Sequence, residues 1–113
     1  MIGVNTPESV HPTKEVECFG EEASAHTAQL LPKGTPVRLV RDTELRDRYG
    51  RLLAYVYRSR DALLVNEHLV ARGFGEAYRF PPNTALAARF SEAQAAARRE
   101  RTGMWAACSD TGG

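Results

Sequence analysis

Long apolar runs are absent from this 113-residue sequence. The longest uninterrupted run, residues 52–57, is far shorter than the roughly 20 residues that a membrane-spanning helix needs. The first residues lack the charged and apolar regions of a signal peptide. With 6 Pro and 9 Gly, no segment has the composition of a linker, and no segment repeats another. Together with 42% hydrophobic and 26% charged residues, these absences predict one compact soluble domain.

Lysine is also scarce, and the net charge of +1 says little about partners. Apart from Lys14 and Lys33, the 15 basic residues are all arginines, and seven of those lie between positions 38 and 60. A guanidinium group binds phosphate through two parallel hydrogen bonds. The arginine-rich segment is therefore compatible with a phosphate-binding surface and equally with a solvated hairpin face. The arginines alone do not identify an anion.

Periodicity and turn residues predict five elements: helices over residues 21–31, 63–72 and 84–101, and strands over residues 35–41 and 51–58. Asn83 is expected to be the N-cap of the last helix. Two strands make only a marginal sheet. Residues 1–4 are therefore expected to be the end of a third strand that begins upstream.

The three histidines, at positions 11, 26 and 68, lack the spacing of metal ligands. A zinc site needs three or four converging donors. We expect these side chains to lie on the surface or to pack between helices. Asn66 and Glu67 are expected to be structural residues at the start of the short helix.

Several short blocks occur in a fixed order along the chain: Asn5-Thr6-Pro7-Glu8, Glu17-Cys18-Phe19-Gly20-Glu21-Glu22-Ala23, Asp47-Arg48-Tyr49-Gly50-Arg51-Leu52-Leu53-Ala54-Tyr55, Val65-Asn66-Glu67, Ala77-Tyr78, Pro82-Asn83, Ser91-Glu92-Ala93-Gln94-Ala95 and Gly103-Met104-Trp105. This set resembles the staphylococcal nuclease (thermonuclease) family over residues 2–108. The resemblance implies an α+β fold, a five-stranded barrel of the oligonucleotide-binding type (OB-fold) packed with three helices. It implies a domain over residues 1–108 whose N-terminal strands lie upstream of Met1, followed by a disordered tail at residues 109–113.

The same resemblance implies a calcium-dependent phosphodiesterase that cuts DNA and RNA, preferably single-stranded, with little sequence preference. Glu8 matches the glutamate that positions or deprotonates the attacking water. Arg51 matches one of two arginines that neutralise the phosphoryl transition state. Arg48 and Tyr49 match residues that contact a terminal phosphate, and Tyr78 matches a tyrosine beside the nucleotide. These roles agree with chemistry, because a phosphodiester is attacked only when its negative charge is masked.

The chain departs from the family pattern at its expected metal site. Asn5 stands where the family usually has an aspartate ligand, and the carbonyl of Thr6 would remain as a ligand. An amide oxygen can coordinate Ca²⁺ but brings no charge, so the site should be weakened. In the family, a second ligand aspartate and a second catalytic arginine lie upstream of the position matched by Ile2. Phe80 also replaces a frequent tyrosine.

Cys18 and Cys108 are the only cysteines. They could be two unrelated buried thiols, but some exported family members pair cysteines at these places, so the resemblance favours a disulfide. A disulfide implies an oxidising compartment, and we expect a secreted or extracytoplasmic monomer whose export signal lies upstream of Met1.

Three hypotheses remain open from the sequence. The first is a thermonuclease-like enzyme, whose 113-residue form we expect to have little or no activity. The second is a non-catalytic nucleic-acid-binding module of the OB-fold type, and the third is an incomplete reading frame whose product folds poorly.

Overall fold

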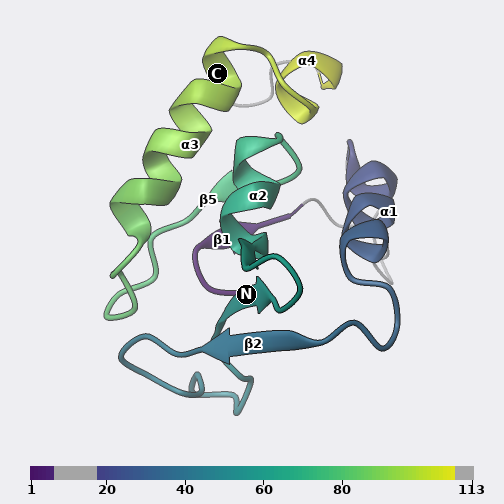
Figure 1. Cartoon of the computed structure of the whole chain (residues 1–113). Helices are drawn as coiled ribbons and strands as arrows, with labels where there is room; N and C mark the ends of the chain where they lie inside the picture. Colours follow the sequence, from purple (N-terminus) through teal and green to yellow (C-terminus); the bar gives the residue numbers. More distant parts are fainter. Residues whose placement is uncertain (7–17, 109–113) are drawn as a thin grey trace.

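The computed structural model describes residues 1–6 and 18–108. Helices and short strands are mixed along the chain (Figure 1). Their order is β1 (Val4–Asn5), α1 (Gly20–Leu30), β2 (Val37–Val40), β3 (Tyr55–Arg58), β4 (Leu63–Leu64), α2 (Val65–Ala71), β5 (Glu76–Ala77), α3 (Ala87–Arg99) and α4 (Met104–Ala107). The α+β class expected from the sequence is confirmed. Glu8 and the expected tail at 109–113 lie outside the described residues.

The strands form two antiparallel sheets rather than one. Strands β1 and β5 make a two-stranded sheet in which Val4 is opposite Ala77, and β2, β3 and β4 make a three-stranded sheet in that order. Over residues 1–6 and 18–108 these sheets do not close into a barrel. The second predicted strand is shorter than expected because the carbonyl of Ala54 accepts a hydrogen bond from the Ile2 N–H at 3.0 Å. Before this point the hairpin pairing continues, since Leu52 is bridged to Arg46 and the Leu53 N–H donates to the Leu45 carbonyl at 2.8 Å.

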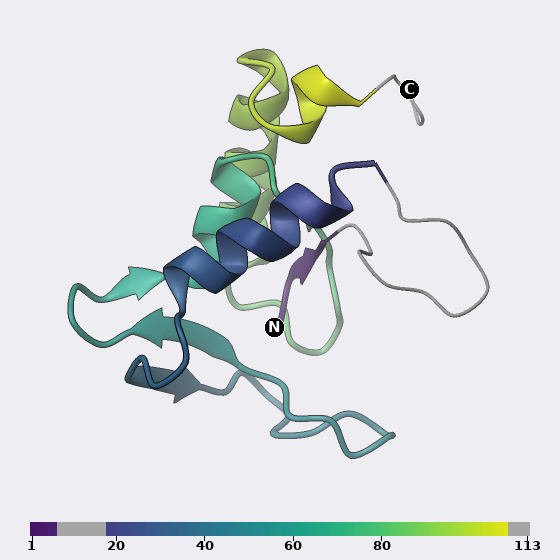
Figure 2. The ribbon, with the colours of Figure 1, turned by 90° about the vertical axis from the view of Figure 1, so that its right-hand side faces the viewer.

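Helix α2 is the centre of the molecule. It lies between α1 on one side and α3 on the other (Figures 1 and 2). Its residues Val65, Leu69 and Val70 are at most 1% exposed. One buried cluster joins Leu30 of α1 to Val65 and Leu69, and a second joins Phe90 of α3 to the apolar residues Ile2, Leu53, Tyr55 and Leu64. The apolar faces of α1 and α3 are therefore both buried against the middle of the fold.

Asn66 is a fully buried polar residue inside this core. Its Oδ1 accepts a hydrogen bond from the Val56 N–H at 2.8 Å, and its Nδ2 donates to the carbonyls of Ile2 at 2.8 Å and Ala54 at 3.3 Å. One side chain thus joins the start of the chain, the approach to β3 and α2. Because buried polar groups are costly unless paired, this network fixes the relative position of the three segments.

The expected N-cap role of Asn83 is wrong, since α3 begins only at Ala87. Asn83 is 2% exposed, and its Oδ1 accepts from the N–H of Glu44 at 2.9 Å while its Nδ2 donates to Glu44 Oε1 at 3.0 Å. It therefore ties the long β2–β3 connection to the turn before α3. Local sequence favours a cap at this position, but the tertiary contact with the hairpin takes the side chain instead.

Asp42 makes a second tie between the same two segments. Its Oδ2 accepts hydrogen bonds from the Tyr55 hydroxyl at 2.5 Å and the Ala85 N–H at 2.8 Å. Burial, together with the bond to Asp42, raises the pKa of Tyr55 to about 12. The tyrosine is therefore a stable donor, and the base of the β2–β3 connection is held against the body of the molecule.

The edge strand β2 is exposed on both faces along its whole length. With β3 it leads into the connection that extends from the body at residues 41–53 (Figure 2). Within the described part of the chain, no helix is both long and apolar enough to cross a membrane.

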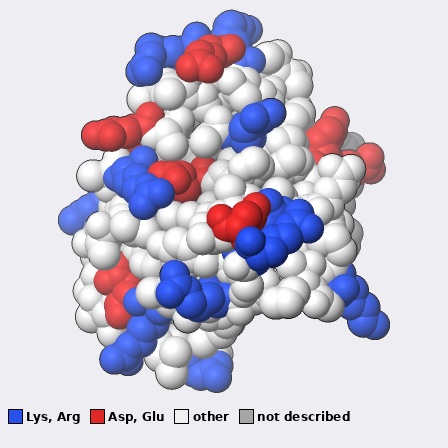
Figure 3. Space-filling model, viewed as in Figure 1, with Lys and Arg blue, Asp and Glu red and all other residues white. Residues whose placement is uncertain are grey.

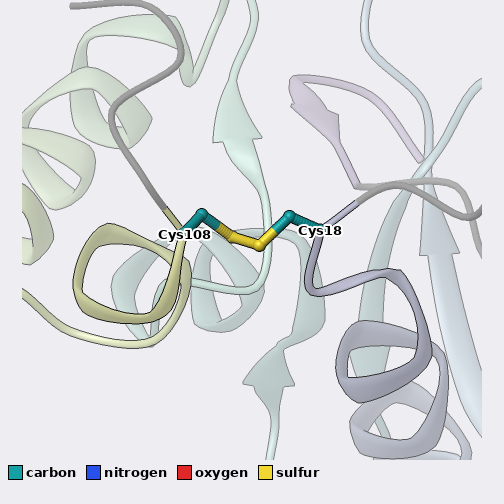
Figure 4. Close-up of a disulfide and its surroundings, with 2 residues drawn as sticks. All are labelled: Cys18 and Cys108. Atoms are coloured by element: carbon teal, nitrogen blue, oxygen red, sulfur yellow. A yellow bond between two sulfur atoms is a disulfide. The ribbon is translucent and has the colours of Figure 1, made fainter.

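Cys18 and Cys108 form a disulfide, as expected from the sequence, with 6.0 Å between their Cα atoms. It joins the residues just before α1 to the end of α4 (Figure 4). Trp105 of α4 is half-buried, and the guanidinium of Arg98 lies 5.1 Å from its ring centre. The C-terminal segment is thus held against both α1 and α3.

Candidate phosphate-binding site

A tight turn at residues 47–51 forms the tip of the β2–β3 connection. The Gly50 N–H donates to the Asp47 carbonyl at 3.0 Å, and the Asp47 N–H donates to the Arg51 carbonyl at 2.9 Å. Gly50 has a φ of 83°, in the left-handed region where glycine avoids a steric penalty. The sequence Asp-Arg-Tyr-Gly-Arg therefore encodes a defined turn rather than an irregular loop.

The carboxylate of Asp47 organises this turn and holds Arg51. Its Oδ1 accepts the N–H groups of Tyr49 at 2.8 Å and Arg51 at 2.9 Å, and its Oδ2 accepts Arg51 Nε at 2.7 Å. Desolvation raises the pKa of Asp47, but the hydrogen bonds from the backbone and from Arg51 outweigh it, so the pKa lies below its usual value. The aspartate is therefore ionised at neutral pH and fixes the near end of the Arg51 guanidinium.

The far end of the same guanidinium is available to a ligand. The Arg51 side chain is 75% exposed, whereas that of Asp47 is only 8% exposed. The Nη1 and Nη2 atoms of Arg51 make no hydrogen bond to any other described residue. These are the atoms that form the paired hydrogen bonds of an arginine–phosphate contact.

Two guanidinium groups lie close to the ring of Tyr49 on this turn. Arg48 Nη2 donates to the Tyr49 hydroxyl at 2.7 Å, and the Cζ atoms of Arg48 and Arg51 lie 4.9 and 5.3 Å from the ring centre. Tyr49 as a whole residue is 68% exposed. An exposed aromatic ring beside arginines is suited to stack a base and bind its phosphate. The structure thus brings Arg48, Tyr49 and Arg51 together, as their expected roles require.

Basic side chains do not form one continuous surface around this turn. On the face shown in Figure 3, blue and red groups are separated by wide white areas, although most of the charged groups near the lower edge are blue. Among the described residues, Asp47 pairs with Arg51, Asp61 with Arg58, and Glu67 with Arg89. Only the first of these pairs belongs to the turn. Because the basic groups are not continuous, affinity for an anion would come mainly from the geometry of the turn rather than from a broad positive field.

Tyr78 lies on a different segment from this turn. Its N–H donates to the Gly3 carbonyl at 2.9 Å, its side chain is 48% exposed, and its ring lies 5.7 Å from that of Phe80. Arg51 also lies near the start of the chain. The pKa of the Met1 amino group is lowered mainly by burial and secondly by the charge of Arg51. No hydrogen bond or ring contact joins Tyr78 to residues 48–51 within the described part of the chain.

Asn5 and Thr6, the expected metal ligands, are exposed at the end of β1. Asn5 is opposite Glu76 of β5, and Gly75 lets the strands approach, since a Cβ there would come within 3.3 Å of the Asn5 carbonyl. Calcium takes 6–8 oxygen ligands, usually including carboxylates. Asn5 and Thr6 offer only neutral oxygens, and in residues 1–6 and 18–108 no three Asp, Glu, His or Cys side chains are grouped to hold a metal. The described residues alone therefore do not make a calcium site.

Asp47 is the residue of the candidate site that the sequence did not single out. Asp47 opens the sequence block that contains Arg48, Tyr49 and Arg51. As an aspartate, however, it does not differ from the other acidic residues of the segment. The signal was its position four residues before Arg51 across a Gly-containing turn, a spacing at which the two charges meet.

Comparison with known proteins identifies the family. Residues 1–107 match the family model described as staphylococcal nuclease homologue. The chain belongs to the staphylococcal nuclease family. The matched segment of this staphylococcal nuclease-family chain contains all of the candidate catalytic, substrate and metal residues and the whole turn at 47–51.

Curated relatives agree with this assignment. The chain is 39% identical over 105 residues to a protein named thermonuclease from Staphylococcus hyicus, and 36% identical over 105 residues to a thermonuclease from Staphylococcus intermedius. It is 35% identical over 103 residues to endonuclease YncB of Bacillus subtilis (strain 168). These alignments cover 90–93% of the chain but only 60%, 61% and 48% of the three relatives. The chain therefore spans about half to three fifths of their length.

Proposed function

We propose that this staphylococcal nuclease-family domain, over residues 1–108, binds and hydrolyses the phosphodiester backbone of nucleic acid. Arg51, fixed by Asp47, would neutralise the phosphoryl group, while Arg48 and Tyr49 would hold a neighbouring terminal phosphate and its nucleotide. Glu8 would orient or deprotonate the attacking water. The observation that carries the proposal is the Asp47–Arg51 pair, which leaves the phosphate-binding end of an exposed guanidinium beside an exposed tyrosine.

Physical chemistry supports this division of roles. A guanidinium that is held at Nε loses little conformational freedom when its Nη atoms bind phosphate, so less of the binding free energy is lost to ordering. A fixed positive charge next to the scissile phosphate also stabilises the charge that develops in the transition state. The aromatic ring of Tyr49 stacks on any base, which fits low sequence specificity and a single-stranded substrate.

The binding part of the proposal is tested with a 5′-phosphorylated single-stranded oligodeoxynucleotide of about eight nucleotides. Replacing Arg51 with lysine keeps the charge but removes the fork, so the affinity should fall about tenfold. Arg60→Lys is the matched control, because it makes the same change at an exposed arginine away from the turn, and it should change affinity by less than about twofold. Equal effects of the two variants would contradict the proposal.

The positioning role of Asp47 is tested by a double-mutant cycle. Asp47→Asn removes the charge that holds Arg51 Nε and should weaken binding of the same oligonucleotide. If Asp47 acts through Arg51, the double variant with Arg51→Lys should bind no more weakly than Arg51→Lys alone. Additive losses would show instead that Asp47 acts on the ligand by another route.

The proposal includes a requirement for calcium, with Asn5 and Thr6 near the ion. Restoring a charge with Asn5→Asp should tighten Ca²⁺ binding on the order of tenfold, because affinity at oxygen sites rises with ligand charge. Isothermal titration of Ca²⁺ into both proteins measures the effect. Asp110→Asn, a charge change in the C-terminal residues, serves as the control. An Asn5→Asp variant with unchanged affinity would remove Asn5 from the metal site.

A non-catalytic nucleic-acid-binding module is the second candidate function. The neutral oxygens of Asn5 and Thr6 favour it, since they would bind a catalytic cation weakly. Calcium-dependent cleavage of denatured DNA separates the two functions. Cleavage that is lost in Glu8→Gln while oligonucleotide binding persists supports the enzyme. Because the enzyme hypothesis already expects little cleavage by the 113-residue chain, the assay is repeated with a version extended upstream of Met1. Binding without cleavage by the extended version supports the module.

We further propose that the domain works outside the cytoplasm as a monomer. The Cys18–Cys108 disulfide supports the location, because such bonds persist in oxidising compartments and are rare elsewhere.

A further inference from the structure

His26 of α1 and His68 of α2 meet edge to edge. Their Nε2 atoms are 3.0 Å apart, and their ring planes differ by only 7°. The ring centroids are 5.2 Å apart. The centroid distance exceeds the distance between the nitrogens by about the sum of the two ring radii. Both nitrogens therefore lie nearly on the line that joins the centroids. This is an N–H···N hydrogen bond, in which one ring donates its proton to the lone pair of the other.

This alignment also excludes a shared metal ion at the pair. Two ligands of one ion must direct their lone pairs at a common third point. Here the nitrogens face each other instead. The interaction therefore depends on protonation alone: one proton between the two Nε2 atoms makes the bond, whereas a second proton sets one N–H against another.

The pair lies in the middle of the contact between α1 and the body of the molecule. The ring of His26 stacks on Phe74 with 4.0 Å between centroids. The two ends of α1 are anchored separately. The Cys18–Cys108 disulfide holds the start of the helix. At its end, the Leu30 side chain packs on Val65 and Leu69, and the Leu30 carbonyl accepts a hydrogen bond from Arg58 Nη1 at 3.2 Å. Figure 2 shows α1 lying across α2. Loss of the histidine bond would therefore loosen the helix between two fixed ends.

The charged groups around the pair oppose further protonation. Burial lowers the pKa of His26, and Arg72 at the end of α2 lowers it further. Burial also lowers the pKa of His68, followed by the effects of His26, Arg72 and Arg58. The nearest carboxylates in the sequence do not compensate: Glu67 is bound to Arg89, and Glu22 is exposed one turn earlier on α1.

We propose that the His26–His68 pair is a pH-sensitive latch, which holds α1 on α2 at neutral pH and releases it in mild acid. When α1 is released, the two imidazoles regain their ordinary affinity for protons. The latch is therefore complete well above the ordinary histidine pKa of about 6.5, and it weakens as the pH falls through that value. The disulfide at one end and the contacts of Leu30 at the other keep the loosened helix attached to the fold.

Amide hydrogen exchange on the full chain with its disulfide intact tests the latch. Between about pH 7.5 and about pH 5, after correction for intrinsic exchange rates, protection of the α1 amides should fall about tenfold. The amides of α3 are the internal reference and should change by much less. The C-terminal half of α1, next to His26, should respond at least as strongly as its first turn, which the disulfide holds.

Two glutamine substitutions assign the effect to the pair. His26→Gln and His68→Gln keep a hydrogen-bonding side chain but prevent the double charge, so each should remove most of the pH dependence in α1. His11→Gln is the matched control, because it removes the third histidine of the sequence and should leave the pH dependence intact. Protection in α1 that is independent of pH, or equal pH dependence in all three variants, would overturn the proposal.

Discussion

Removal of the Cys18–Cys108 disulfide is expected to lower the free energy of unfolding by about 4 kcal/mol. The bond spans 90 residues and therefore restricts the unfolded chain strongly. It also joins α1 to the C-terminal helix, two elements that lie at opposite ends of the described chain. Urea unfolding of the Cys18→Ala/Cys108→Ala variant, compared with the oxidised parent, measures the loss.

Reduction provides the control for this prediction. A reducing agent should destabilise the parent by a similar amount and should leave the double alanine variant unchanged. Titration of the denatured parent without reductant should find no free thiol. Two reactive thiols, or a loss below about 1 kcal/mol in the double variant, would contradict the prediction.

Replacing Asn66 with alanine is expected to cost about 3 kcal/mol, because the Val56 N–H and the Ile2 carbonyl lose their buried partner. The side chain is fully buried, so water cannot readily replace those hydrogen bonds. Asn66→Asp tests the same network with almost no change in shape. Its carboxylate can accept from Val56 but meets the carbonyl oxygens of Ile2 and Ala54.

The aspartate variant should therefore be unstable at neutral pH and gain stability on acidification, since a protonated carboxyl can donate to a carbonyl. Gln94→Ala is a useful comparison. The Gln94 side chain is half-buried and, among the described residues, accepts a single hydrogen bond, from the Ala77 N–H. This substitution should cost less than Asn66→Ala. A loss below about 1 kcal/mol for Asn66→Ala would show that the network contributes little.

Local signals predicted the elements whose causes are local. The acidic first turn and the Pro32-Lys33-Gly34 stop placed α1 to within about a residue, and alternation located β2 and part of β3. A strand end was expected at residues 1–4, and β1 overlaps it at Val4. Its pairing with β5 was not predictable, because each strand has only two residues and the two are distant in sequence. The role of Asn83 was wrong for the same reason, since its partner Glu44 is distant in sequence.

The candidate site also has a part that local sequence predicts and a part that depends on contacts between distant segments. Arg48, Tyr49 and Arg51 lie within one turn, so their sequence neighbourhood already placed them together. Tyr78 reaches the start of the chain through a backbone bond to Gly3 that no local pattern encodes. The His26–His68 contact joins two helices that are far apart in sequence, and the spacing of the histidines gave no indication that they would meet.

The most direct test of the account is an amide chemical-shift map of the ¹⁵N-labelled chain during titration with the 5′-phosphorylated oligonucleotide. We expect the largest shifts at Arg48, Tyr49, Gly50 and Arg51 and a smaller response at Tyr78. In Arg51→Lys the effect at the turn should be lost. Shifts centred on α3 or on the disulfide end of the molecule, with residues 47–51 unchanged, would contradict it.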